Sequence, residues 1–145
     1  MKAVLTRVTS ASVMVQKKIT STINHGLLIL LGIQKGDEIK DVEKLAKKII
    51  SLRIFNDEKG MNRSIKDVSG EALIISQFTL CANTKKGRRP NFSDAEKPSI
   101  ALQMYEKFCK TLNNDIPIQT GQFGAHMEIS STNDGPVTII LDTKD

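Results

Sequence analysis

The chain has 145 residues and a formal net charge of +5 at pH 7. A chain of this length can bury a core of its own without disulfides or metals, and its two cysteines, Cys81 and Cys109, form no CxxC pair. No apolar run approaches the roughly 20 residues that a membrane helix requires. We therefore expect one domain over residues 1–145, located in the cytoplasm and not associated with a membrane.

The first third of the chain predicts mainly β structure. Alternation of apolar and polar residues predicts strands at residues 2–8 and 11–16. Residues 19–23 complete a hairpin with the second of these. A continuous apolar run at residues 27–33 has the length of a strand that is covered on both faces.

A helix follows this run, and Asp37 is its predicted N-cap. Apolar residues between Ile39 and Ile50 recur at spacings of three and four, with lysines between them. The lysines could contact RNA or simply face water, and the helical pattern favours a solvated face. Residues 56–70 are rich in turn residues and predict a loop or a short hairpin.

The next apolar run, at residues 72–75, predicts a strand that ends in an unusual polar segment. This segment is Ser76-Gln77-Phe78-Thr79-Leu80. Hydroxyl and amide groups beside an aromatic ring, at the end of a buried strand, are typical of a pocket rim.

A long loop at residues 82–97 carries the densest basic cluster of the chain, which consists of Lys85, Lys86, Arg88 and Arg89. A cluster beside a pocket suits a polyanionic partner, because neutralised phosphates release counterions. Composition alone is equally compatible with a solvated basic surface.

The last third predicts a second helix and three strands. The helix begins at Pro98, and its buried stripe is Ile100, Met104, Phe108 and Leu112. The strands are predicted at residues 116–119, 125–130 and 137–141. Gly135-Pro136 precedes the last strand, where glycine is flexible and proline cannot donate to a β ladder. That strand must therefore begin at an edge, or with its carbonyls aimed at something else.

Motifs of the common hydrolases are absent. The histidines His25 and His126 and the isolated cysteines offer no metal-ligand cluster, so we expect neither a metal nor another cofactor. GxSxG and the phosphate-binding glycine loops do not occur. Nothing in the sequence places His126 beside Ser76 for a serine triad. What remains is an active site made largely of backbone groups.

Two segments together resemble the signatures SQFTL and NxGPVT of the D-aminoacyl-tRNA deacylases. They are residues 76–80 and residues 133–138. Further matches follow in order along nearly the whole chain, among them Arg7-Val8-Thr9, Gly26-Leu27-Leu28, Arg53-Ile54-Phe55, Arg89-Pro90, Phe92-Ser93 and Gln119-Thr120-Gly121. The resemblance implies a single compact, β-dominated α/β domain with two packed β layers and two helices on one face. It also implies a tRNA partner and hydrolysis of the ester of D-aminoacyl-tRNA, and of glycine mischarged on tRNA, while L-aminoacyl-tRNA is rejected.

The resemblance assigns the catalytic donors and the pocket lining to the first signature, which here is Ser76, Gln77, Phe78 and Thr79. An aminoacyl ester is activated, and one oriented N–H donor at the developing oxyanion typically contributes about 10²–10³ in rate. In the family, Thr79 and the ribose 2′-OH of the substrate are competing candidates for the nucleophile. We favour assistance by the 2′-OH, because the sequence identifies no base beside Thr79. A purely local hydrogen bond of the Thr79 hydroxyl is a third interpretation.

Chiral selection is assigned by the same resemblance to Gly135 and Pro136, with Leu80 and Arg7. In the family, the two main-chain carbonyls of the Gly-Pro pair, joined by a cis bond, enter the pocket of a partner subunit. A homodimer is therefore implied, with Arg7 orienting these carbonyls. The alternative for Arg7 is an exposed charge at a strand edge.

Phe123 and Met127 are candidates for an apolar slot that holds the 3′-terminal adenosine, with core packing as the alternative. Cys81, next to the pocket, would be sensitive to oxidation if exposed. Two rival functions exist. A non-catalytic RNA-binding module leaves the joint occurrence of the two signatures unexplained, and a small-molecule esterase lacks its usual nucleophile motif.

Overall fold

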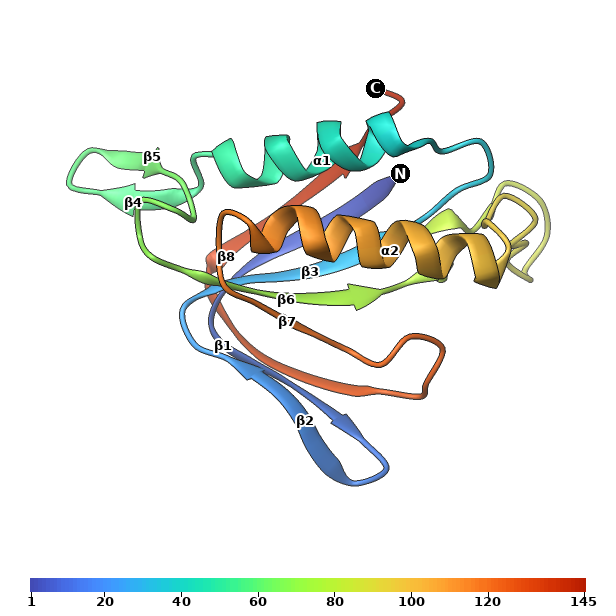
Figure 1. The fold of residues 1–145 in the computed structure, drawn as a ribbon, viewed down its shortest axis with the longest axis horizontal. Coiled ribbons are helices and arrows are strands. Elements are labelled where there is room, and N and C mark those ends of the chain that lie inside the picture. Colours follow the sequence, from blue (N-terminus) through green and yellow to red (C-terminus); the bar gives the residue numbers. More distant parts are fainter.

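A computed structural model describes all residues, 1–145. Its main strands are β1 Lys2–Val15, β2 Lys18–Ile23, β3 Gly26–Gly32, β6 Glu71–Ser76, β7 Ile118–Thr120 and β8 Glu128–Asp142. Its helices are α1 Ile39–Ser51 and α2 Pro98–Asn113. The strands form one sheet in the order β2-β1-β3-β6-β7, with β8 on the other edge of β1, and both helices cover one face (Figure 1). Neither helix has the length and apolar composition needed to cross a membrane.

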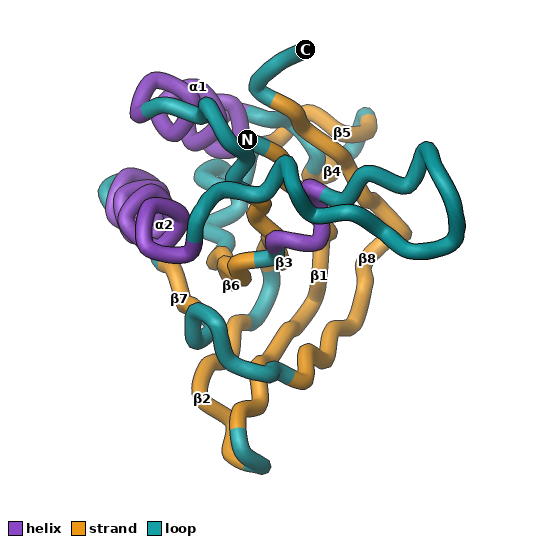
Figure 2. The backbone as a smooth tube through the Cα atoms, turned by 90° about the vertical axis from the view of Figure 1, so that its right-hand side faces the viewer, coloured by secondary structure: helices purple, strands orange, loops and turns teal.

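The sheet curls so strongly that it approaches a barrel (Figure 2). One half of β1 pairs with β3 and the other half with β2, so the sheet bends along this strand. Ser21 on β2 donates its hydroxyl to the carbonyl of Thr120 on β7, at 2.6 Å, across the remaining opening. The predicted β-dominated domain with two helices on one face is confirmed, and its two β layers are two parts of one curled sheet.

The core has two parts, one on each face of β3. Under the helices, α1 contributes Val42, Leu45, Ala46 and Ile49, and α2 contributes Met104, Tyr105, Phe108, Cys109 and Leu112. Inside the curl, eight buried residues fill the space between the layers: Val8, Ala11, Val13, Val15, Ile23, Leu28, Leu73 and Ile75. The apolar run of β3 is buried on both faces, as predicted.

Two strands are longer than predicted, because each continues through a polar segment that was expected to interrupt it. The predicted strands 2–8 and 11–16 are one strand, β1, and the predicted strands 125–130 and 137–141 merge into β8. The pairing of these two long strands skips: Thr6 faces Thr138, whereas Val8 faces Asn133. Four residues of β8 therefore stand opposite Arg7, and the Gly135-Pro136 turn is absorbed as a bulge. Residues 55–63 form the expected short hairpin, of β4 Phe55–Asp57 and β5 Gly60–Arg63.

The predicted N-cap of the first helix is wrong. Asp37 is buried, and its carboxylate accepts hydrogen bonds from the Met1 ammonium, at 2.8 Å, and from the Gln34 N–H, at 2.6 Å. Glu38 is the N-cap instead, and its N–H donates to the Asp41 carboxylate at 2.8 Å. That backbone hydrogen bond lowers the pKa of Asp41. The sequence offers two adjacent acids, and the distant Met1 ammonium that binds Asp37 leaves no local signal to distinguish them.

Candidate active site

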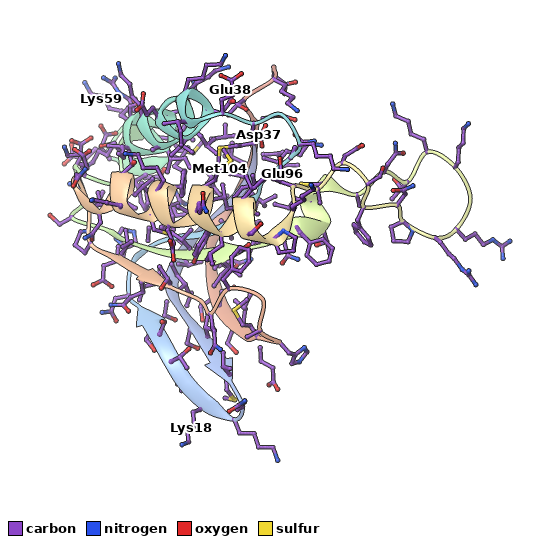
Figure 3. The ribbon with its side chains drawn as sticks, turned by 45° about the vertical axis from the view of Figure 1, so that its right-hand side comes forward. Lys18, Asp37, Glu38, Lys59, Glu96 and Met104 are labelled. Atoms are coloured by element: carbon purple, nitrogen blue, oxygen red, sulfur yellow. The ribbon has the colours of Figure 1, made fainter.

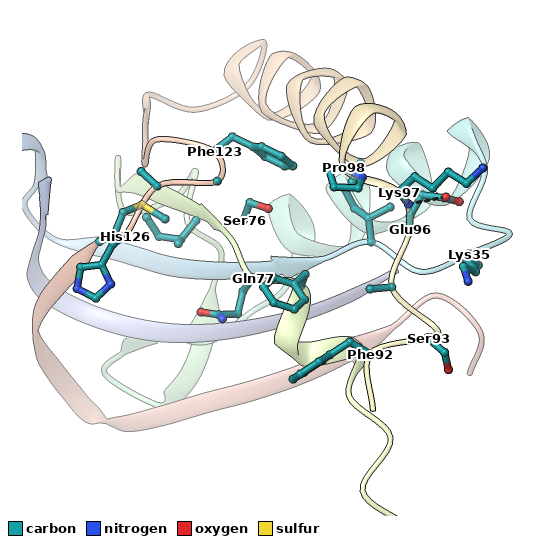
Figure 4. A pocket seen from close by; sticks show the side chains of 18 of the residues that line it. Lys35, Ser76, Gln77, Phe92, Ser93, Glu96, Lys97, Pro98, Phe123 and His126 are labelled. Atoms are coloured by element: carbon teal, nitrogen blue, oxygen red, sulfur yellow. Dashed lines mark hydrogen bonds between the residues drawn. The ribbon is translucent and has the colours of Figure 1, made fainter. Parts of the chain in front are cut away.

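The main cavity lies at the carboxyl ends of three parallel strands, β3, β6 and β7. It has a volume of about 720 Å³. Four segments line it: the residues that follow β3, the end of β6 with the residues that follow, the loop that leads into α2, and the loop between β7 and β8. Figure 4 shows Ser76, Gln77, Phe92 and Phe123 around it. Open sheets bind ligands at the carboxyl ends of their parallel strands, so this cavity is the natural candidate for the site.

The first signature turns sharply where β6 ends. Residues Phe78–Cys81 form a short 3₁₀ helix, η1. The Gln77 N–H still donates to the carbonyl of Leu31 on β3, at 2.8 Å. The first N–H groups of a helix have no acceptor within it, and none of the turn and loop hydrogen bonds uses the N–H of Phe78 or of Thr79. No turn, loop or side-chain hydrogen bond therefore engages these two backbone donors at the edge of the cavity.

Some side chains of this signature line the cavity, and others pack against the rest of the protein. Ser76, Gln77 and Phe78 line the cavity, and Phe78 is 57% exposed. The exposed Thr79 accepts a hydrogen bond from the Gln77 side-chain amide, at 2.5 Å. No carboxylate or imidazole is hydrogen-bonded to the Thr79 hydroxyl, so no general base stands beside it.

Leu80 and Cys81 fasten η1 to β3 and do not line the cavity. A Cβ at Gly32 would lie 2.9 Å from the Leu80 Cβ, so glycine is required for this close approach. The Cys81 thiol is buried, contacts the carbonyl of Ile33 at 3.4 Å, and has its pKa raised by burial. A buried thiol with a raised pKa is inert, so the exposure on which oxidation sensitivity depended is not met.

Arg7 is buried, which excludes the exposed strand-edge alternative. Its Nε lies 3.0 Å from the Asp134 carboxylate and also donates to the Asp134 carbonyl, at 3.3 Å. Its Nη1 donates to the carbonyl of Ile54, at 2.7 Å. The guanidinium therefore ties β8 to the segment that leads into β4, directly beside Gly135.

Gly135 and Pro136 are exposed, and the peptide bond between them is cis. Gly135 has a φ of +125°, and a Cβ there would lie 2.9 Å from the Val137 nitrogen and 3.1 Å from Arg7 Nη2. Glycine is thus required both by conformation and by space.

Within one chain, the two signatures do not meet. Arg7 and Asp134 line a second cavity, of about 400 Å³, whose other lining residues are His25, Phe55, Asn56, Arg63 and Val68. Neither cavity is lined by residues of both signatures. The sequence predictions for catalysis and for chiral selection therefore map to separate places on the protomer.

Phe123 and Met127 both line the main cavity and both also pack on the core. Phe123 stacks at a tilt on Tyr105, with ring centroids 5.8 Å apart. A Cβ at Gly121 would lie 2.7 Å from the Met127 sulfur, so this glycine makes room for the methionine. Phe92 also lines the cavity and was not predicted to do so, although an aromatic residue in a long polar loop was a usable signal.

Comparisons with known proteins show the family to which the chain belongs. A family model described as D-Tyr-tRNA(Tyr) deacylase matches residues 4–142. A D-aminoacyl-tRNA deacylase of Thermosipho africanus (strain TCF52B) is 51% identical over 146 residues, covering 99% of this chain and 98% of that protein. The chain belongs to the D-Tyr-tRNA(Tyr) deacylase family.

Two solved structures share the fold. One, the c-Myc DNA Unwinding Element Binding Protein, has a TM-score of 0.92 and 41% identity over 98% of each chain. The other, described as a probable eukaryotic D-amino acid tRNA deacylase, has a TM-score of 0.80 over 97% of each chain, and its 15% identity supports the fold alone.

Proposed function

We propose that the N–H groups of Phe78 and Thr79, at the start of η1, form the oxyanion hole of this deacylase. The family's activity is hydrolysis of the ester that joins a D-amino acid to tRNA. Negative charge develops on the carbonyl oxygen of that ester, and donors fixed by the fold stabilise it without reorganisation. The carrying observation is that no turn, loop or side-chain hydrogen bond uses the N–H groups of Phe78 and Thr79, beside a cavity of about 720 Å³. A non-catalytic RNA-binding role is not favoured. A cytoplasmic location, where aminoacyl-tRNA is used, is part of the proposal.

Chiral selection is proposed to come from the main-chain carbonyls of Gly135 and Pro136. A rigid carbonyl wall beside the substrate Cα excludes an L side chain and leaves the D direction open. Glycine passes the same wall, because it has no side chain in either direction. Arg7 is the residue proposed to hold the wall, through its bonds to Asp134 and Ile54.

The test of this function compares D-Tyr-tRNA, L-Tyr-tRNA, glycyl-tRNA and a simple activated ester. We expect hydrolysis of the first and third, with L-Tyr-tRNA rejected near thousandfold, which corresponds to a mismatch of about 4 kcal/mol. Equal rates on the D and L esters would refute the filter. Rapid hydrolysis of the simple ester alone would indicate a small-molecule esterase.

The protein is expected to be a homodimer whose partner supplies the Gly135-Pro136 wall to the main cavity. The two signatures occupy separate cavities in one chain. The 15-residue strand β8 also has one edge that pairs with no other strand, and its Ile140 side chain is 74% exposed. Proteins usually cover such an edge. Sedimentation should give twice the chain mass. A monomer with full activity would refute the proposal that the two subunits share the site.

Thr79→Ala is expected to retain most of the deacylation activity, because the backbone donors and the substrate 2′-OH remain. The side-chain partner of the lost hydroxyl is Gln77, which can turn to water. Single-turnover hydrolysis of D-Tyr-tRNA measures the effect, with Thr22→Ala on β2 as a matched control. A variant that keeps its fold but has no activity would restore Thr79 as the nucleophile.

A further inference from the structure

The positive charge of the chain is concentrated in one exposed segment. Residues 83–91, the basic arm, project from the body between η1 and α2 (Figure 3). All nine residues are exposed, and they include four cations and no acid. The chain has 21 Lys and Arg residues, so 17 lie elsewhere, against 16 Asp and Glu residues. The arm therefore accounts for nearly the whole net charge of +5.

None of the arm's cations is neutralised within the chain. The six ion pairs of the structure involve other residues. No side-chain hydrogen bond uses Lys85, Lys86, Arg88 or Arg89 as a side-chain donor, and only the Lys85 N–H is engaged, with the Asn83 side chain. Four adjacent unpaired cations repel one another, and a polyanion relieves this repulsion.

The base of the arm is fixed and is joined to the main cavity. Asn83 and Asn91 close it with two backbone hydrogen bonds, of 2.7 and 3.0 Å. Phe92 follows directly and packs edge-on against Phe78, with ring centroids 5.1 Å apart. Both rings line the cavity. Beyond Phe92, the Lys35 N–H donates to the carbonyl of Asp94, at 2.9 Å, which holds the loop to the end of β3.

We infer that the basic arm binds the phosphates of the single-stranded 3′ end of the tRNA, next to the ester in the cavity. This inference rests on the proposed function and deepens it. About three residues separate the closed base from the tip, so the arm reaches roughly 10 Å from the cavity rim. Its cations therefore meet the phosphates of the last few nucleotides. Phosphate contacts position a nucleic acid without reading its sequence, so the arm serves any tRNA.

The test combines Lys85→Gln, Lys86→Gln, Arg88→Gln and Arg89→Gln in one arm variant. A control variant removes the same charge from exposed helix positions, with Lys47→Gln, Lys48→Gln, Lys107→Gln and Lys110→Gln. Three D-tyrosyl esters are the substrates: those of adenosine, which has no phosphate, of the trinucleotide CCA, and of tRNA. The value of kcat/KM is measured at several salt concentrations.

We expect the arm variant to lose about tenfold or more in kcat/KM on D-Tyr-tRNA at low salt, and less on the CCA ester. Its plot of log kcat/KM against log salt should be shallower by about 0.7 for each lost phosphate contact. The adenosine ester should react as in the wild type, and the control variant should lose much less.

Four results would overturn the inference. The first two are an unchanged rate on D-Tyr-tRNA and an equal loss of rate in the control variant. The third is a loss of rate on the adenosine ester, which would mean that the arm only shapes the cavity. The fourth is a loss of rate on tRNA without a loss on the CCA ester, which would place the contact on the tRNA body. Failure of the proposed function is distinct, because the wild type would then hydrolyse none of the three esters.

Discussion

Gly135→Ala is expected to lower the hydrolysis of D-Tyr-tRNA by about 10²-fold and to weaken the discrimination against L-Tyr-tRNA. The added methyl group would lie 2.9 Å from the Val137 nitrogen and 3.1 Å from Arg7 Nη2, so the backbone must move. A φ of +125° is also strained for any L side chain, at a cost of about 1–3 kcal/mol. A displacement of about 1 Å in a positioning group can cost about 10²-fold in rate.

Gly60→Ala is the matched control for this variant. Gly60 has nearly the same φ, +127°, but no atom lies within 4 Å of a Cβ built there. Both variants should lose stability to urea because of the strained φ, Gly135→Ala the more because of its close contacts, and only Gly135→Ala should lose rate and selectivity. Wild-type rates and selectivity in Gly135→Ala would show that the Gly-Pro filter is wrong and that side chains such as Gln77 or Phe78 select the enantiomer.

Sequence patterns predicted the helices and strands that are determined by the local pattern of apolar and polar residues. The periodicity of residues 39–50 and 98–112 defined both helices, and the continuous apolar run at 27–33 identified a strand buried on both faces. Long-range partners decided the rest. Asp37 was predicted as a cap because the Met1 ammonium, 36 residues away in sequence, leaves no local signal.

The chemistry of the site was harder to predict than its location. The segment 76–80 was correctly expected at the end of a buried strand, beside a pocket. The sequence did not distinguish Leu80, which packs toward β3, from Phe78, which lines the cavity, because a 3₁₀ turn sends neighbouring side chains in different directions. Phe92 joins the cavity only because the loop before α2 folds back on Phe78.

Arg7→Lys is expected to lower kcat/KM on D-Tyr-tRNA by about 10²-fold, although the charge is kept. The guanidinium contacts the carboxylate and the carbonyl of Asp134 and the carbonyl of Ile54 at the same time. An ammonium is a point charge and cannot span these directions. Asp134 directly precedes Gly135, so loss of the guanidinium contacts allows the Gly-Pro carbonyls to move. A shift of about 1 Å in a positioning group can lower the rate by about 10²-fold.

The same substitution should also lower the free energy of unfolding by about 1–3 kcal/mol, because a buried carbonyl loses its donor. Stability loss alone would not change which enantiomer is hydrolysed, so the ratio of D-Tyr-tRNA to L-Tyr-tRNA rates separates the two effects. Arg53→Lys, at an exposed position next to Ile54, is the control and should match the wild type. If Arg7→Lys were less stable but kept the wild-type ratio, Arg7 would support the fold without positioning the wall. We expect the ratio to fall, because the wall has no other buried cation beside it.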